Sequence, residues 1–115
     1  MAVPGVFRAA TSTLEVAAGA IIFEEGDLGD EMYGVVSGSV ELRRSDGKVF
    51  TVGPDDTFGE MALIDASPRS TSAVAITDTV LAAIDKKRFV FLVQETPMFA
   101  LQVMGSMARR LRAAG

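Results

Sequence analysis

The chain of 115 residues contains no cysteine and no histidine. The absence of cysteine excludes disulfides and thiolate chemistry, and it is compatible with a cytoplasmic setting. The absence of histidine as well argues against zinc sites of the usual kind, histidine-based acid–base catalysis and haem held by either residue. A metal site would have to consist of carboxylates alone, and the sequence has no calcium-loop spacing. We therefore expect a protein without a metal or other cofactor.

The sequence also lacks long hydrophobic runs. No stretch reaches the length of about 18 apolar residues that predicts a transmembrane helix. The N-terminus has no charged segment followed by an apolar one, so we expect no signal peptide and a cytoplasmic location without membrane attachment. A hydrophobic fraction of 49% in a chain of this length predicts one globular domain with a single core.

Charge is distributed unevenly along the chain. Residues 1–85 carry 5 basic and 14 acidic side chains, whereas residues 86–115 carry 6 basic side chains and one acidic one. An acidic body repels nucleic acid, so any such binding would depend on the basic C-terminal part alone. We interpret these basic residues as solvated faces of helices and expect no nucleic-acid partner.

Between residues 14 and 85 the apolar residues follow the two-residue period of β-strands. Turn signals such as Gly26-Asp27-Leu28-Gly29-Asp30 and Ser45-Asp46-Gly47 separate the runs. Short strands at regular spacing predict an antiparallel sandwich or jelly-roll and argue against a parallel sheet. The predicted strands cover residues 14–16, 20–23, 33–36, 40–43, 48–52, 71–76 and 80–84.

The C-terminal part, residues 86–115, has the pattern of helices. Asp85 can cap a helix over residues 86–94, and Pro97 fits the first turn of a second helix that reaches about Arg112. The second helix is apolar over more than half of its circumference, which predicts two packing partners. One partner is the β-structure, and the other is a second subunit unless both faces pack internally. Residues 1–13 form a short N-terminal segment.

The central stretch, residues 58–72, carries the chemistry. It begins Phe58-Gly59-Glu60, continues through a short apolar turn of helix, and ends with Arg69 between Pro68 and Ser70. A glycine before a helical turn exposes backbone N–H groups that attract an anion, and an arginine supplies a planar fork for phosphate. A carboxylate such as Glu60 suits a sugar hydroxyl instead. Phosphate and sugar together predict a nucleotide-sized ligand.

At this point the sequence resembles the cyclic nucleotide-binding domain family, which includes the catabolite activator protein and the regulatory subunits of protein kinase A. The family's phosphate-binding cassette, Gly-Glu-x-Ala-Leu followed by Arg-[Ser/Thr/Ala], is complete here from Gly59 to Ser70. The segments 26–33 and 37–40 also match the family's glycine-spaced strands. The resemblance covers about residues 14–112. It implies a β jelly-roll over residues 14–85 with C-terminal helices, a mainly β fold of the α+β kind.

The resemblance also implies a role for each site residue. Glu60 would accept a hydrogen bond from the ribose 2′-hydroxyl, and Arg69 would pair with the cyclic phosphate. The expected ligand-binding residues are Gly59, Glu60, Met61, Ala62, Arg69, Ser70 and Thr71, with the backbone N–H groups of Ala62 and Ser70 on the phosphate. Asp30 matches a position that orients the cassette arginine in kinase-type members.

Each residue has an alternative interpretation. Glu60 is also explained as a carboxylate at a helix N-terminus, and Arg69 as a surface ion pair with Asp65. Asp30 is equally typical of turn chemistry. The base is less well defined, because Ser70 fits both adenine and guanine ligands. The positions at which activator-type members hold the base with hydroxyls fall at about Ala114 and Gly115, which have none.

We therefore expect a non-catalytic sensor domain that binds cAMP, or alternatively cGMP, and signals by repositioning its last helix. A homodimer or an effector protein would contact that helix. One rival is a ligand-free interaction domain of the same fold, and another is the same fold with a dinucleotide or metabolite. A metal-dependent cupin or a cyclic nucleotide phosphodiesterase would normally need histidine-rich metal sites, which this chain lacks.

Overall fold

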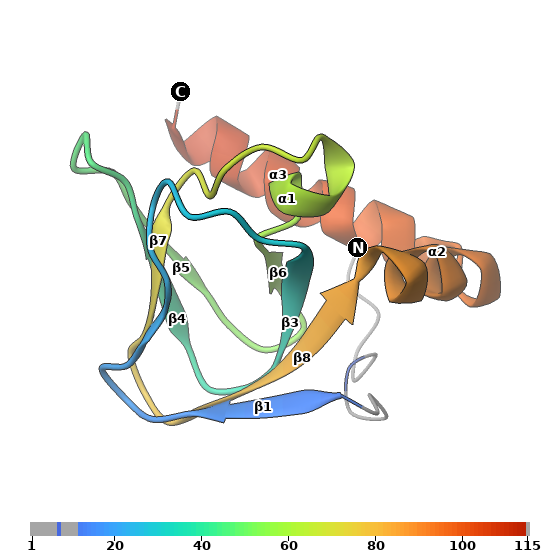
Figure 1. Ribbon diagram of the computed structural model, residues 1–115, viewed down its shortest axis with the longest axis horizontal. Coiled ribbons are helices and arrows are strands. Elements are labelled where there is room, and N and C mark those ends of the chain that lie inside the picture. Colours follow the sequence, from blue (N-terminus) through green and yellow to red (C-terminus); the bar gives the residue numbers. More distant parts are fainter. Residues whose placement is uncertain (1–6, 8–11, 115) are drawn as a thin grey trace.

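The computed structural model describes residue 7 and residues 12–114. Eight strands form two four-stranded antiparallel sheets, which face each other as a sandwich (Figure 1). The first sheet has the order β1 (Thr13–Val16), β8 (Thr79–Asp85), β3 (Glu31–Ser37), β6 (Thr57–Phe58). The second has the order β2 (Ile21–Phe23), β7 (Ser72–Ala75), β4 (Val40–Arg43), β5 (Val49–Val52).

Consecutive strands often belong to different sheets, which is the topology of a jelly-roll. The predicted mainly β jelly-roll with C-terminal helices is confirmed. All seven predicted strands occur, with end positions that differ by a few residues. The two-residue strand β6 was not predicted, because Thr57 and Phe58 are too short a run to show alternation. The N-terminal segment predicted at residues 1–13 lies mostly outside the described residues.

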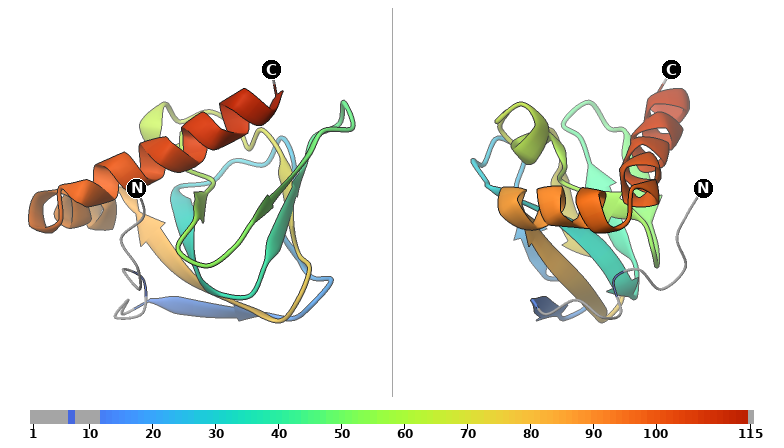
Figure 2. Two further views of the ribbon diagram at one scale, coloured as in Figure 1. Left: turned by 180° about the vertical axis from the view of Figure 1, so that it is seen from behind. Right: turned by 90° about the vertical axis from the view of Figure 1, so that its right-hand side faces the viewer.

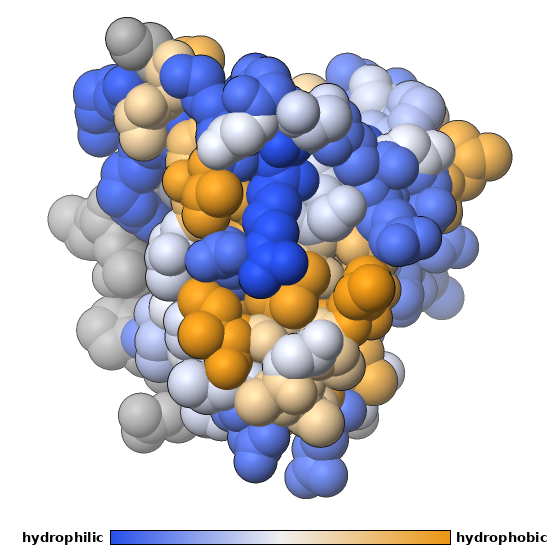
Figure 3. Space-filling view, turned by 90° about the vertical axis from the view of Figure 1, so that its left-hand side faces the viewer, coloured by the Kyte–Doolittle hydropathy of each residue, from blue (hydrophilic) through white to orange (hydrophobic). Residues whose placement is uncertain are grey.

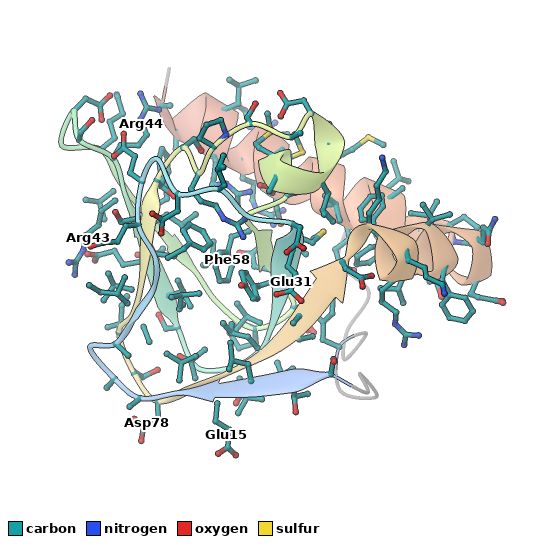
Figure 4. All side chains as sticks on the ribbon, viewed as in Figure 1. Glu15, Glu31, Arg43, Arg44, Phe58 and Asp78 are labelled. Atoms are coloured by element: carbon teal, nitrogen blue, oxygen red, sulfur yellow. The ribbon has the colours of Figure 1, made fainter. Side chains whose placement is uncertain are left out.

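The core between the sheets consists of inward-facing side chains from both of them. Its fully buried members are Phe23, Val35, Val40, Leu42, Val52, Phe58, Ala73 and Leu81. Phe58 lies between the sheets (Figure 4), where its ring packs against those of Phe23 and Tyr33 with centroids 6.0 and 5.4 Å apart. This aromatic cluster therefore forms the floor beneath the stretch that follows Phe58 in the chain.

The first sheet is buried on its outer face as well, because the helices cover it. Alternate residues of β3 and β8, Met32 and Ile84 among them, pack there against Phe99 and Val103. Phe7 is 2% exposed and meets Phe99 edge-to-face, with ring centroids 6.0 Å apart. A Cβ on Gly34 would lie 2.5 Å from the Phe7 ring, so the strand must carry glycine at this point to admit the ring. Phe7 is thereby anchored to the helical layer.

The described residues also contain three helices. They are α1 (Met61–Ile64), α2 (Lys86–Glu95) and α3 (Met98–Ala114). The Asp85 carboxylate accepts a hydrogen bond from Arg88 N at 2.8 Å, which confirms the predicted cap of α2. Helix α3 begins at Met98, directly after Pro97, and crosses the molecule toward the β4–β5 hairpin (Figure 2).

Only one face of α3 is buried. Phe99 and Val103 pack on the first sheet, whereas Leu101, Met104 and Leu111 are 51%, 57% and 76% exposed. One of the two predicted packing partners of this helix, the β-structure, is thus confirmed, whereas the second subunit stays a prediction. No helix among them is long and apolar enough to cross a membrane.

Replacing Phe7 by alanine tests the anchor before β1. The change removes a buried ring and leaves a cavity against Phe99, so we expect a loss of about 3 kcal/mol in the free energy of unfolding. Urea denaturation measures the loss. The matched control is Phe91→Ala on α2, whose ring is 45% exposed and should cost well under half as much. Equal losses for the two variants would contradict the anchoring role.

Candidate functional site

A pocket of about 640 Å³ opens between the second sheet, the stretch 58–72 and α3. The stretch and the sheets supply Phe23, Leu42, Arg44, Phe50, Gly59, Glu60, Met61, Ala62, Arg69, Ser70 and Thr71. Helix α3 supplies Met104, Met107, Ala108, Arg110, Leu111 and Ala114. All seven residues predicted to bind the ligand therefore line a single pocket. Its size is that of a small-molecule site.

Arg69 lies in the wall of this pocket and is 7% exposed. Its Nη1 donates to the Gly59 carbonyl oxygen at 3.0 Å, and its guanidinium carbon lies 4.3 Å from the centre of the Phe23 ring. The backbone is fixed too, because Arg69 N donates to Asp27 O and Gly26 N donates to Arg69 O, both at 2.8 Å. A surface ion pair with Asp65 is thus the wrong interpretation of Arg69, since the arginine is buried.

Two glycines make room for the buried guanidinium. A Cβ on Gly29 would lie 2.3 Å from Nη2 of Arg69, and one on Gly59 would lie 2.8 Å from Nη1. Gly59 also has a φ of +77°, a conformation that other residues rarely adopt. Gly59 was predicted as a site residue but Gly29 was not. Its only signal in the sequence was its place in a glycine-rich turn.

The Nε of Arg69 is buried and has no hydrogen-bond partner among the described residues. A buried charged donor without a partner is costly, and native proteins rarely leave one unmatched. The pocket that Arg69 lines is therefore suited to an anion with several acceptor oxygens, which a guanidinium binds through parallel hydrogen bonds. The chemistry of the donor set fits a phosphate.

Glu60 is 5% exposed and forms an ion pair with Nη2 of Arg110 on α3. Nη1 of the same arginine donates to the Thr57 carbonyl oxygen at 3.0 Å. Arg110 thus contacts both ends of the segment 57–60 that leads into α1. Glu60 is the residue before α1, and its carbonyl oxygen accepts from Leu63 N and Ile64 N. The sequence did not predict this pair, because Arg110 is 50 residues away in a basic stretch that was interpreted as solvated.

A second set of polar contacts fixes α3 against the loop before β6. The Ser106 hydroxyl donates to the Asp56 carboxylate at 2.7 Å and accepts from Thr57 N at 3.4 Å, while Arg109 pairs with the same carboxylate. One turn earlier, the Gln102 amide donates to the Asp55 carbonyl oxygen. The side of α3 that faces the loop before β6, away from most of the pocket-lining residues of the helix, is therefore held by hydrogen bonds as well as by apolar packing.

Asp30 is exposed, and its predicted role behind Arg69 stays a prediction. The neighbouring Tyr33 ring lies 5.9 Å from the Arg69 guanidinium. Burial raises the pKa of the Tyr33 hydroxyl, and the Glu31 carboxylate raises it further, against a smaller opposing effect of Arg69. Tyr33 is consequently neutral at pH 7. The charged lining residues of the pocket are then three arginines and one glutamate, a balance that favours an anionic ligand.

The fold and pocket define a class of protein, the jelly-roll domains that hold a small ligand at a short helix inserted between two strands. Residues 13–96 match the family described as the cyclic nucleotide-binding domain. The match spans most of the chain, so the chain belongs to the cyclic nucleotide-binding domain family. Within the described residues, no group of three or more acidic side chains is placed to hold a metal ion.

Named relatives agree with this membership. The chain is 41% identical over 98 residues to the cyclic AMP receptor protein of Thermus thermophilus, covering 81% of this chain and 45% of the relative. It is 47% identical over 74 residues to a cAMP-dependent protein kinase regulatory subunit of Eremothecium gossypii, covering 64% of this chain and 16% of the relative. The crystal structure of the Thermus thermophilus catabolite activator protein superposes with a TM-score of 0.73 at 40% identity, covering 90% of this chain and 51% of that one. The chain thus spans about half or less of the length of these relatives.

A double-mutant cycle tests the contact between the site and α3. Arg110→Met removes the partner of a buried carboxylate and should cost about 3 kcal/mol in the free energy of unfolding. Glu60→Gln in the same chain removes the buried carboxylate charge that Arg110→Met leaves unpaired. The double variant should therefore lose less free energy of unfolding than the two single variants together. Urea denaturation measures all four proteins. Arg109→Met, at a more exposed pair, should cost under about 1 kcal/mol. Additive losses at residues 60 and 110 would show that the two side chains do not interact.

Proposed function

We propose that this domain binds a cyclic nucleotide, cAMP or alternatively cGMP, as a ligand that it does not convert. The observation that carries the proposal is the buried, unpartnered Nε of Arg69 in the wall of a pocket that also contains the Glu60 carboxylate. A cation for phosphate beside an acceptor for hydroxyl groups matches a ribose closed on its own phosphate. The pocket is also large enough for the purine.

Each predicted residue has a place in this complex. Arg69 binds the cyclic phosphate, assisted by the backbone N–H groups of Ala62 and Ser70. Glu60 accepts from the ribose 2′-hydroxyl, and Gly59 admits the sugar close to the backbone. Met61 and Thr71 complete the wall, and Asp30 orients Arg69 from behind.

The names of the relatives support the ligand class. Both the receptor protein of Thermus thermophilus and the kinase regulatory subunit are named for cyclic AMP. Relatives of this kind are regulators, which supports a non-catalytic role in signal transduction. The rival is a regulatory or interaction domain of the same fold that has no ligand or a different one. Buried Arg69 and Glu60 favour a liganded domain, because both charges line the pocket and the Nε of Arg69 has no partner among the described residues.

The signal would travel through α3. Helix α3 lines the pocket with six side chains and is tied to Glu60 by Arg110. A ribose that hydrogen-bonds to Glu60 changes the environment of this ion pair, and a purine contacts the same side of the helix. The segment from Phe89 to Pro97, which includes the break between α2 and α3, would act as the hinge. Ligand binding would then shift the population of α3 positions.

The exposed face of α3 would transmit that position to a partner. Leu101, Met104, Ala108 and Leu111 follow one another at spacings of three, four and three residues, which is the spacing of a two-helix coiled-coil seam. The last three of them also line the pocket, so a partner on this seam would border the ligand. A second copy of the chain would use this seam to form a homodimer, and an effector protein would use the same apolar side chains.

Calorimetric titration tests the ligand class. We expect saturable binding of cAMP or cGMP by the wild-type chain and a loss of about 100-fold in affinity for Arg69→Ala, because a charge-assisted contact disappears. Arg88→Ala on α2, which is not among the lining residues, is the matched control and should bind as the wild type does. Thermal unfolding of each variant separates loss of binding from loss of fold. Wild-type affinity in a folded Arg69→Ala variant would refute the role of Arg69.

The movement of α3 can be followed with spin labels. Because the chain has no cysteine, cysteines introduced at Glu15 and Arg112 would be the only labelling sites. Both residues are exposed, one on β1 and the other near the end of α3. We expect the distance distribution between the labels to shift or narrow when cyclic nucleotide is added.

The matched control pair lies entirely in the sandwich, at Glu15 and the exposed Thr51 of β5. Its distance should not change with ligand. An unchanged distance in the first pair at saturating ligand would show that α3 does not report on binding.

A further inference from the structure

Arg44, the residue after β4, is a charged residue on the side of the strand that is otherwise apolar and faces the pocket. Val40 and Leu42 of β4 are buried in the core, whereas Glu41 and Arg43 alternate with them and pair with each other on the outer face. Figure 3 shows that outer face with a strip of hydrophilic side chains between hydrophobic patches, and Figure 4 shows Arg43 pointing away from the molecule. Arg44 continues the ladder, because its N–H donates to the Lys48 carbonyl oxygen at 2.9 Å. By alternation it shares the side of Leu42, and it lines the pocket.

Arg44 lies at the end of the pocket beyond the sugar site. Arg110 of α3 marks the position of Glu60, and Ala114 follows one helical turn later, about 6 Å along the axis. The Lys48 ammonium donates to the Ala114 carbonyl oxygen at 3.0 Å, which ties the β4–β5 hairpin to this last turn. Arg44 is the hairpin residue paired with Lys48 and lies near this end of α3 (Figure 4). Its guanidinium is therefore separated from the phosphate and sugar residues by the region in which a base would lie.

The other side chains around this end are apolar. Leu42, Phe50, Met107 and Leu111 line the pocket here, and the hydroxyls that would hold a base at about Ala114 are missing. Apolar walls accept any purine face but do not distinguish its edge. Ser70 and Thr71 supply hydroxyls at the cassette, and Arg44 is the charged lining residue at this end of the pocket.

The Arg44 guanidinium is already positioned for such a contact. Its Nη2 donates to the Asp46 carboxylate at 2.6 Å, and Lys48 N donates to the same carboxylate at 3.1 Å. Within the part of the chain that the structure describes, Nη2 is the nitrogen of Arg44 that forms a hydrogen bond with a side chain. The other two guanidinium nitrogens have no hydrogen-bond partner among the described residues, and Arg44 lines the pocket.

The two purines differ at the edge that an arginine recognises. Guanine presents two acceptors, O6 and N7, which match the guanidinium fork, whereas adenine presents the N7 acceptor beside a 6-amino donor. We propose that Arg44 reads this edge and makes the domain selective for cGMP over cAMP. The inference rests on the proposed function, since it assigns the base of the ligand that Arg69 and Glu60 would hold.

The experiment compares three ligands by calorimetric titration of the wild-type chain. Cyclic IMP has the O6 and N7 acceptors of guanine but lacks its 2-amino group, so it isolates the edge assigned to Arg44 from any contact of Ser70. We expect cGMP and cIMP to bind with similar affinity and about tenfold or more tightly than cAMP, the discrimination that a bidentate arginine gives.

Arg44→Gln should reverse the preference, because a glutamine amide pairs with the N7 acceptor and 6-amino donor of adenine. Arg43→Gln is the matched control. It removes the same charge from the adjacent residue on the outer face and should keep the wild-type ratio of affinities. The ratio of cGMP to cAMP affinity is the readout, so a general loss of stability in either variant does not affect the result.

The outcomes separate the two proposals. If none of the three nucleotides binds to the wild type, the proposed function fails and this inference fails with it. If they bind but cAMP is as tight as cGMP, or Arg44→Gln leaves the ratio unchanged, the domain is a cyclic nucleotide sensor and the role of Arg44 is wrong. A preference for cGMP that cIMP does not share would assign selectivity to the 2-amino group and overturn the inference as well.

Discussion

The burial of the Arg69 guanidinium is the constraint around which the site is built. A charge that is 7% exposed needs partners, and the protein supplies the Gly59 carbonyl, the face of Phe23 and space opposite Gly29. The buried Nε is left without a partner among the described residues, which suits a ligand with acceptor oxygens. The aromatic floor of Phe23, Tyr33 and Phe58, the two glycines and the pairing of the Arg69 backbone with residues 26 and 27 all follow from holding this one side chain.

The strands and the local part of the site could be predicted from the sequence, because both depend on neighbouring residues. The alternation of apolar and polar residues predicts the strands. The cassette from Gly59 to Ser70 is one continuous stretch, so its motif can be read directly from the sequence. Contacts between distant residues leave no such pattern. The Glu60–Arg110 pair spans 50 residues, and the approach of Gly29 to Arg69 depends on how a loop folds over the cassette. The short strand β6 was missed for a related reason, since its two residues become a strand only by pairing with β3.

The two ends of the pocket differ in how their charged side chains are held in place. At the cassette, charged groups are buried and fixed by backbone contacts, so they suit the part common to all cyclic nucleotides. At the β4–β5 hairpin, Arg44 is more exposed, with 38% of its side chain accessible, and is held by a turn carboxylate. Hairpin residues can change without disturbing the core, whereas the cassette arginine cannot. A division of this kind lets the hairpin end of the pocket change in sequence while the cassette end is kept.

The row of hydrogen bonds beneath α3 also determines how the helix can move. An apolar interface tolerates small sliding displacements, but the Gln102 amide and the Ser106 hydroxyl are buried and each has a defined partner in the loop before β6. A partial shift of the helix would leave those groups unmatched, at a cost of about 1–3 kcal/mol for each. These polar contacts therefore favour the described position of the helix over slightly shifted ones, which apolar packing alone would not do.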